Sequence, residues 1–216
     1  MRYNFGTEIL NASGEKVGEL HQVVIDPVTD QVTSLIAKKG FLLPSDKVIP
    51  ISLVMDSTEE HIKLYDFEGS YDDLDDYVEI QFVPAEEGRK NQMVDDDDER
   101  PLLLPYPPAG SIPFGFSPVI NYPDRLQTKR VKNIPEKTIE IPEGAKVLGM
   151  NGEHVGNVEE VITNPRSDRV THFIMSKGIF FNEEKMIPSG WVSGYDSNQL
   201  KLVVDSKIVE QLPEYK

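Results

Sequence analysis

An internal repeat sets the architecture that this sequence can adopt. Aligned with itself at an offset of 138 residues, the chain matches without a gap from Thr7 to its end, with 21 identities over 72 positions. Many shared residues are glycines and prolines, whose backbone geometry is restricted. We interpret eight of them as structural turn residues: Gly14, Gly18, Pro27, Gly40, Gly152, Gly156, Pro165 and Gly178. A chain of 216 residues is therefore predicted to hold two copies of one small module.

The segment between the copies differs in composition. Residues 85–132 contain an acidic run, Asp95–Glu99, followed by seven prolines between Pro101 and Pro123. Proline removes backbone donors and favours an extended chain, so we interpret this segment as a linker. Its apolar side chains are costly to expose, which leaves docking onto a barrel or a second subunit as one hypothesis and disorder as the other. The predicted domains are a first copy at 1–84, the linker at 85–132 and a second copy at 133–216.

Within each copy the residue pattern is typical of strands. Residues 15–25 and 32–37 are rich in β-branched side chains and flank a turn at Pro27, and the second copy repeats this arrangement. Strands joined by short turns are expected to pair antiparallel. Each copy ends in a segment expected to be helical, Tyr71–Tyr77 capped by Ser70 and Lys207–Gln211 capped by Ser206. Short strands bury a small core best by curling up, so the predicted fold class is all-β, with two small antiparallel β-barrels, each with a short C-terminal helix.

These residues resemble the PRC-barrel family. The resemblance is clearest in the second copy, at Gly152–Glu159, Asp168–Phe173 and Ile187–Pro188, and looser in the first, at Gly14–Leu20, Asp30–Thr33 and Val48–Pro50. It covers about two thirds of the chain and implies a reusable binding module without catalytic residues to carry over. Family members include the cytoplasmic part of the photosynthetic reaction-centre H subunit and the C-terminal domain of a ribosome-maturation factor. The chain differs from the first in lacking a transmembrane helix and from the second in its acidity and the lack of an N-terminal domain. We therefore expect a free-standing tandem PRC-barrel protein.

The charge of the chain restricts its partners. With 37 acidic and 22 basic residues the net charge is −15, which argues against direct binding to nucleic acid. The first copy carries 6 basic and 16 acidic residues and the second 9 and 13, so the first is the favoured docking face for a basic partner. Zero cysteines exclude disulfides, thiolate metal sites and a cysteine nucleophile. No transmembrane segment or signal peptide is predicted, and we expect a cytoplasmic protein, with peripheral association with a membrane complex left open.

Two apolar segments at equivalent positions are the candidate partner or dimer interface. Three consecutive apolar residues cannot all face one small core, because strand side chains alternate between the two faces. Some of them should therefore meet the other copy, the linker or a second subunit. The candidates are Phe41, Leu42, Leu43, Ile179, Phe180 and Phe181. Trp191 is an additional aromatic candidate, and the alternative for this residue is that it is buried in the core.

Neither a catalytic residue, a cofactor nor a metal site is predicted. None of the four histidines recurs in the other copy, and the sequence lacks the common catalytic and phosphate-binding motifs. The leading hypothesis is a non-enzymatic protein-interaction or scaffolding protein that binds a partner protein or itself as a homodimer. One alternative is a ribosome-associated or RNA-processing accessory factor. A second alternative is a metal-dependent hydrolase that uses aspartates around 72–76 and 95–98, since carboxylate oxygens ligate Mg²⁺ and Ca²⁺.

Overall fold

The computed structural model describes residues 1–38, 46–67, 70–84, 126–176, 184–196 and 198–215. Within them the secondary structure is mostly β-strand, with one short α-helix and three turns of 3-10 helix, which confirms the all-β class. The chain forms two compact units, one of Met1–Tyr77 with Asn133–Lys216 and the other of Val78–Lys132. The predicted domain boundaries stay a prediction.

The first copy supplies a curled sheet with the strand order β5-β4-β3-β2-β7-β6. Its strands are β2 (Glu8–Leu10), β3 (Lys16–Asp26), β4 (Gln31–Lys38), β5 (Lys47–Pro50), β6 (Val54–Ser57) and β7 (His61–Leu64), with a 3-10 turn at Ile51–Leu53. Val23, Leu35 and Ile49 lie opposite one another on the three strands β3, β4 and β5 and are fully buried. Branched and aliphatic residues favour such pairs because they fill the pleated surface between strands.

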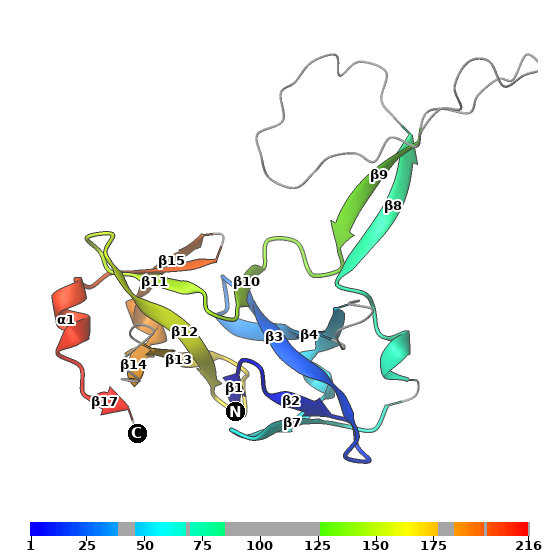
Figure 1. The fold of residues 1–216 in the computed structure, drawn as a ribbon, viewed down its shortest axis with the longest axis horizontal. Coiled ribbons are helices and arrows are strands. Elements are labelled where there is room, and N and C mark those ends of the chain that lie inside the picture. The colour runs from blue at the N-terminus through cyan, green and yellow to red at the C-terminus, as the bar shows by residue number, and fades with distance from the viewer. Residues whose placement is uncertain (39–45, 68–69, 85–125, 177–183, 197, 216) are drawn as a thin grey trace, which may run out of the picture. The chain divides into compact units, whose positions relative to one another are not determined.

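The second copy repeats this sheet with the order β15-β16-β11-β12-β13-β14-β17 (Figure 1). Its strands are β11 (Lys146–Leu148), β12 (His154–Thr163), β13 (Val170–Ser176), β14 (Glu184–Pro188), β15 (Val192–Asp196), β16 (Gln199–Leu202) and β17 (Glu214–Tyr215), with a 3-10 turn at Ser189–Trp191. The buried row across β12, β13 and β14 is Val161, Phe173 and Ile187. These are the residues 138 positions after Val23, Leu35 and Ile49, so the repeat register is kept in three dimensions.

Each sheet contains one parallel pair, which corrects the prediction of purely antiparallel sheets. β2 pairs parallel with β7, and β11 pairs parallel with β16, whereas the hairpin-connected neighbours are antiparallel. A tight turn forces its two strands to be antiparallel, but β2 and β7 are joined through four intervening strands and a 3-10 turn. Curling of the sheet brings these two strands together, and their relative direction then follows from the number of reversals between them.

The two copies exchange one strand each. β1 (Arg2–Asn4) of the first copy pairs with β12 of the second, and β10 (Ile139–Pro142) of the second pairs with β3 of the first (Figure 1). The registers are equivalent, because Tyr3 lies opposite Val161 and Ile141 lies opposite Val23. Each sheet is therefore completed by a strand from the other half of the chain.

A second reciprocal contact joins the turns that follow β3 and β12. The amide of Val32 donates to the carbonyl of Asp168 over 3.0 Å, and the amide of Val170 donates to the carbonyl of Asp30 over 2.8 Å. Gln31 and Arg169, which are equivalent in the repeat, form an isolated bridge with each other. These contacts are reciprocal, because equivalent residues of the two copies donate to each other. Reciprocal contacts of this kind define a pseudo-twofold relation between the two copies.

The hydrophobic core is continuous across both copies. One cluster of buried side chains includes Tyr3, Leu35 and Ile62 of the first copy together with Val158 and Phe173 of the second. Tyr3 and Ile141, at the centres of the exchanged strands, are 0% and 1% exposed. The exchanged strands thus contribute to the core as well as to the sheet edges.

The predicted turn residues divide into two structural types. Gly14 and Gly152 lie in the hairpin loops before β3 and β12 with φ of +85° and +78°, where glycine avoids the strain of a side chain. Gly18 and Gly156 lie inside strands β3 and β12 instead of in turns. A Cβ at Gly18 would stand 3.0 Å from the carbonyl oxygen of Lys38, so this glycine permits a close approach of neighbouring strands. The sequence pattern registers only that glycine is required, and it cannot tell these two reasons apart.

The other predicted turn residues occupy loops or fall outside the description. Pro27 and Pro165 lie in the turns after β3 and β12, which close on Asp30 and Asp168 with φ of +57° and +53°. Gly40 and Gly178 lie outside the described residues.

The C-terminal element of each copy differs from the prediction, by a shift of one residue in the second copy and by its length in the first. In the second copy α1 spans Ser206–Glu210, one residue earlier than predicted, because the carboxylate of Asp205 caps it by accepting from the amide of Lys207. The first copy has only a 3-10 turn at Tyr71–Asp73, so the predicted helix to Tyr77 is wrong. The amide of Tyr77 donates to the carbonyl of Asp46, which ties the chain back to the start of β5 and ends the turn.

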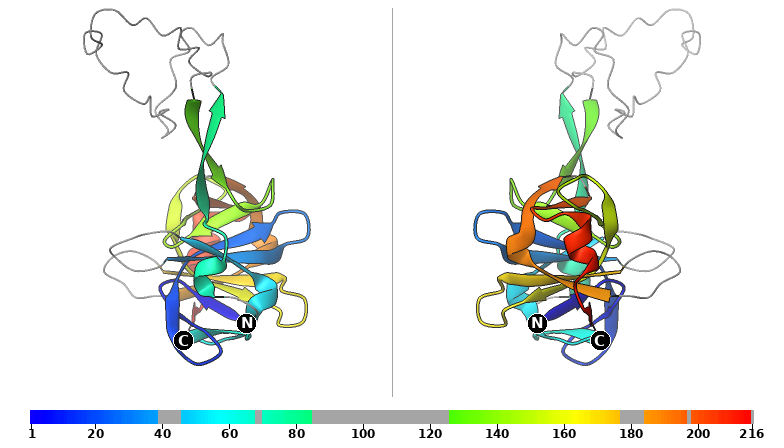
Figure 2. Two further views of the ribbon diagram at one scale, coloured as in Figure 1. Left: turned by 90° about the vertical axis from the view of Figure 1, so that its right-hand side faces the viewer. Right: turned by 90° about the vertical axis from the view of Figure 1, so that its left-hand side faces the viewer.

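A buried lysine holds each C-terminal element. Lys47 donates to the carbonyl of Leu74 over 2.6 Å, and Lys185 donates to the carbonyl of Leu212 over the same distance. These four residues are equivalent in the repeat. The right-hand view of Figure 2 shows the red helix α1 beside the orange strand that carries Lys185. Lysine suits this role because its ammonium group can donate hydrogen bonds to carbonyl groups that a short helical turn leaves without intrahelical donors.

The second compact unit contains an antiparallel hairpin of β8 (Val78–Pro84) and β9 (Leu126–Lys132). β9 falls within the predicted linker. Its only apolar residues, Leu126 and Val131, do not alternate with polar ones, so the sequence pattern did not indicate a strand here.

Candidate functional site

The structure places little of the predicted interface. Phe41, Leu42, Leu43, Ile179, Phe180 and Phe181 lie outside the described residues, so their role stays a prediction. Trp191 is partly buried and packs against the core, as does Tyr195, whose pKa is raised to about 12 by burial. The carbonyl of Trp191 accepts from the amide of Val203.

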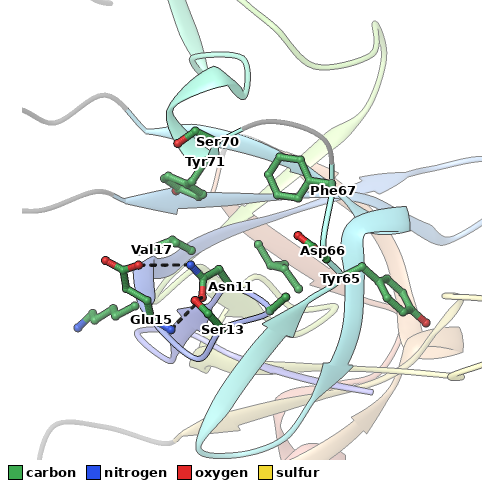
Figure 3. Close-up of a pocket in the computed structure, with 13 residues that line it drawn as sticks. Asn11, Ser13, Glu15, Val17, Tyr65, Asp66, Phe67, Ser70 and Tyr71 are labelled. Atoms are coloured by element: carbon green, nitrogen blue, oxygen red, sulfur yellow. Dashed lines mark hydrogen bonds between the residues drawn. The ribbon is translucent and has the colours of Figure 1, made fainter.

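An open groove in the first copy is a candidate site among the described residues. It has a volume of about 870 Å³ and lies between the β2–β3 hairpin, the segment after β7 and the 3-10 turn (Figure 3). We call it the first-copy groove. Its lining residues are Asn11, Ala12, Ser13, Glu15, Lys16, Val17, Gly18, Leu64, Tyr65, Asp66, Phe67, Ser70 and Tyr71.

The first-copy groove combines an apolar wall with an acidic edge. Figure 3 shows Phe67 and Tyr71 on one side and the hairpin residues Asn11 and Glu15 on the other. Leu64 is buried at the base, since strand β7 alternates its side chains and turns this one inward. Such a surface suits a ligand that has both an apolar part and a positively charged part.

The hairpin wall is held by the side chain of Asn11. Its Oδ1 accepts from the amide of Glu15 over 2.8 Å and from the hydroxyl of Ser13 over 2.7 Å. Asparagine commonly stabilises loops in this way, by bonding to the backbone a few residues ahead. The hairpin therefore keeps its shape without support from the segment after β7.

The charged residues that line the groove are one lysine, Lys16, and two carboxylates, Glu15 and Asp66. Lys16 Nζ contacts Glu8 Oε1 at 2.8 Å and Glu19 Oε1 at 2.7 Å, and these carboxylates raise the pKa of Lys16. Among the ion pairs between described residues, none involves Glu15 or Asp66, both of which are exposed on the groove. The groove edge is therefore net negative.

The second copy has a pocket of about 330 Å³ at a partly equivalent place, lined by Glu153, His154, Val155, Met175, Lys185, Ser206, Val209 and Glu210. Four of these residues, Glu153, His154, Val155 and Val209, correspond to residues that line the first-copy groove. Here the hairpin is tied to the segment that leads into α1. The amide of Met150 donates to the carbonyl of Val204 over 2.8 Å, and the hydroxyl of Ser206 donates to Glu153 Oε2 over 2.5 Å. The hydrogen bonds from Ser206 and Asn151 lower the pKa of Glu153.

The corresponding tie is missing from the described part of the first copy. Ala12 and Asp66 are equivalent to Met150 and Val204, but the backbone bonds between described residues do not include one from Ala12 to Asp66. Among the described residues, this backbone bond therefore joins the two walls in the second copy and is not found in the first.

Two of the acidic residues suggested for a hydrolase, Asp73 and Asp76, have structural partners. Asp73 Oδ2 accepts from the amide of Ser70, and Asp76 forms an ion pair with the buried Lys47 at 3.0 Å. Asp95–Asp98 lie outside the described residues. Within the described part of the chain, groups of three or more side chains suited to hold a metal ion are not found.

Sequence reasoning missed the first-copy groove, because its walls come from two regions that are far apart in the chain, residues 11–18 and residues 64–67 with 70–71. The repeat register offers no clear signal either. Tyr65, Asp66 and Phe67 correspond to Val203, Val204 and Asp205 and share no residue with them, but only 21 of the 72 aligned positions are identical, so runs of differing residues are common in this repeat.

The fold and the groove define a duplicated all-β domain protein with a ligand-sized surface hollow. The chain belongs to the PRC-barrel domain family, whose model matches residues 5–87 and 136–210. It is also similar to an uncharacterised protein of Deinococcus radiodurans, with 26% identity over 85 residues. That alignment covers 39% of this chain and 31% of the relative. Of the helices that the structure describes, none has both the length and the apolar character to span a bilayer.

Proposed function

We propose that this protein is a non-catalytic binding module of the cytoplasm, built from two PRC-type barrels, which recognises a basic partner protein. Each barrel corresponds to one curled sheet with the strand that it receives from the other copy. The proposal rests first on the first-copy groove, an open hollow with apolar walls and an uncompensated acidic edge. Association between proteins of opposite charge is steered by long-range attraction, and the net charge of −15 favours basic partners.

The test starts with affinity capture by the intact chain from a lysate of its source organism. A captured protein counts only when it is purified and binds the purified chain in a saturable titration. Because attraction between exposed charges is screened by salt, the expected affinity falls by about tenfold between low and physiological ionic strength. The double substitution Phe180→Ser with Phe181→Ser tests the predicted apolar loops in the same titration.

Two outcomes would overturn the proposal. One is a chain that captures no protein whose binding can be reconstituted. The other is a chain that associates only with itself by light scattering, since it would then be a self-assembling structural protein. A captured RNA whose binding survives removal of all protein would point to the ribosome-associated alternative instead.

A further inference from the structure

We propose that the first-copy groove binds an arginine side chain presented by a basic segment of a partner protein. This inference rests on the proposed function and adds the place and the chemistry of recognition. It is carried by the charge of the groove, by the nature of its walls and by the hydrogen bond that the second copy makes to the equivalent glutamate.

The charge of the groove calls for a cation from outside. Lys16 is the basic residue on the lining, and its ammonium group is already engaged by Glu8 and Glu19, neither of which lines the groove. The carboxylates of Glu15 and Asp66 remain on the edge, where an incoming guanidinium group can donate to either of them. Arginine carries five N–H donors in a planar fork, which suits bidentate recognition of a single carboxylate such as that of Glu15 or Asp66.

The walls of the groove suit the rest of that side chain. Val17, Leu64, Phe67 and Tyr71 are apolar or aromatic residues of the lining. Figure 3 shows Glu15 near Val17 on the hairpin side and Asp66 near Phe67 on the opposite side. Arginine buries its methylene stem along apolar residues of this kind while its charged end stays near solvent, and its planar group stacks on aromatic rings. A simple cation such as Mg²⁺ would use the carboxylates but leave these apolar residues without a contact.

The second copy shows a hydrogen bond to the glutamate that is equivalent to Glu15. There Ser206, from the chain's own α1, donates to the carboxylate of Glu153, which is the repeat equivalent of Glu15. A donor from within the chain thus satisfies Glu153. The first copy keeps the carboxylate, replaces Val204 and Asp205 by Asp66 and Phe67, and has a groove more than twice as large. Glu68, the repeat equivalent of Ser206, lies outside the described residues. Among the described residues, Asn11 Nδ2 donates to the Glu15 carboxylate over 3.5 Å, and a carboxylate can accept further hydrogen bonds from a donor on another protein.

The probe for this proposal is the pentapeptide acetyl-Ala-Ala-Arg-Ala-Ala-amide, titrated into the intact chain and followed by amide NMR shifts. Its matched control is the same peptide with citrulline, which has the shape of arginine without its charge. The expected result is saturable shifts at Glu15, at Leu64–Phe67 and at Tyr71, with the citrulline peptide binding about tenfold more weakly. Shifts that do not saturate, that are equal for both peptides, or that map to the second-copy pocket would overturn the inference.

Paired variants separate the groove from general charge. Glu15→Gln with Asp66→Asn removes two negative charges from the groove, and Glu60→Gln with Glu136→Gln removes two from exposed sites outside its lining. The groove variant should bind the arginine peptide about tenfold more weakly, and the control variant should bind within about twofold of the parent. Equal losses in both variants would show that only bulk charge is sensed and would refute a site.

The same variants distinguish failure of this inference from failure of the proposed function. A reconstituted partner that binds the groove variant as tightly as the parent would exclude the groove while the binding function stands. Failure of the partner experiment itself would remove the function, whatever the peptide does.

Discussion

Arg2 links the exchanged strand β1 to the sheet that receives it. Its Nε and Nη2 donate to the two carboxylate oxygens of the buried Glu160 at 2.5 and 2.7 Å, and its guanidinium group lies 5.8 Å from the ring centre of Tyr215. A third contact joins Arg2 Nη1 to Glu59 of the first copy. The hydrogen bond with Glu160 raises the pKa of Arg2 further above its ordinary value. One side chain thus contacts elements of both copies.

Replacement of Arg2 by methionine should destabilise the fold by about 2 kcal/mol, because it leaves the carboxylate of Glu160 buried without its partner. The additional change Glu160→Gln should recover part of this loss, since a neutral amide is cheaper to bury than an unpaired charge. Urea unfolding of the parent, the two single variants and the double variant measures the coupling. Additive effects of the two changes would show that the pair is not coupled.

Glu153 makes stability depend on pH through Ser206. Because its folded-state pKa is lowered, the stabilisation is present above the ordinary carboxyl pKa of about 4.3 and is lost as the pH falls through the folded-state pKa. Ser206→Ala should therefore lower the melting temperature at neutral pH, and the difference from the parent should shrink below about pH 4. Ser189→Ala is the control, because its hydroxyl donates to the carbonyl of Val170, which does not titrate in this range. A difference in melting temperature between Ser206→Ala and the parent that stays constant with pH would contradict the role given to Glu153.

At the scale of elements, Gly18 and Gly156 set the spacing of adjacent strands. A Cβ at Gly156 would overlap the carbonyl oxygen of Ser176 and lie 2.8 Å from Met175 Cε, whereas at Gly18 the nearest atom is the Lys38 carbonyl oxygen at 3.0 Å. Gly156→Ala should cost about 3 kcal/mol and Gly18→Ala about 1 kcal/mol, because only the first must move backbone by a large amount. Chemical denaturation of both variants tests the order. A Gly18 variant less stable than the Gly156 variant would contradict it.

The strands of each copy could be predicted from the sequence, but the exchange between the copies could not. Residues 16–26 and 31–38 show local signals, namely β-branched composition and proline-containing turns, and local signals do not depend on distant partners. Arg2–Asn4 and Ile139–Pro142 occupy equivalent places in the repeat, so either could pair with β3 or β12 in the same register. The chain connection decides between them, and a residue pattern does not contain that information.

The candidate site was still less accessible to sequence reasoning. Apolar runs in the sequence directed attention to residues 41–43 and 179–181, whereas the first-copy groove is made by exposed residues of mixed character such as Glu15, Tyr65 and Asp66. A hollow arises from how two distant regions of the chain meet, and each region alone looks like an ordinary surface.

At the scale of the whole molecule, the two copies should unfold together. Tyr3→Ala in the first copy and Ile141→Ala in the second each remove a buried side chain from the shared core and should each cost about 3 kcal/mol. Calorimetry should show that both substitutions lower the midpoint temperature of one and the same unfolding transition, because each copy contributes a strand to the other's sheet. Val28→Ala, at a position that is 89% exposed, is the control and should change little. Two separate transitions, of which each substitution shifts only one, would disprove the shared unit.

The reciprocal exchange of β1 and β10 has an evolutionary consequence. After the duplication that produced the two copies, neither could be deleted or transferred to another protein alone, because each would leave behind an unpaired sheet edge and take away a strand that its sister requires. Surfaces away from the exchanged strands are not constrained in this way. The groove segment of the first copy and its counterpart in the second could therefore diverge in sequence while the fold kept both copies together.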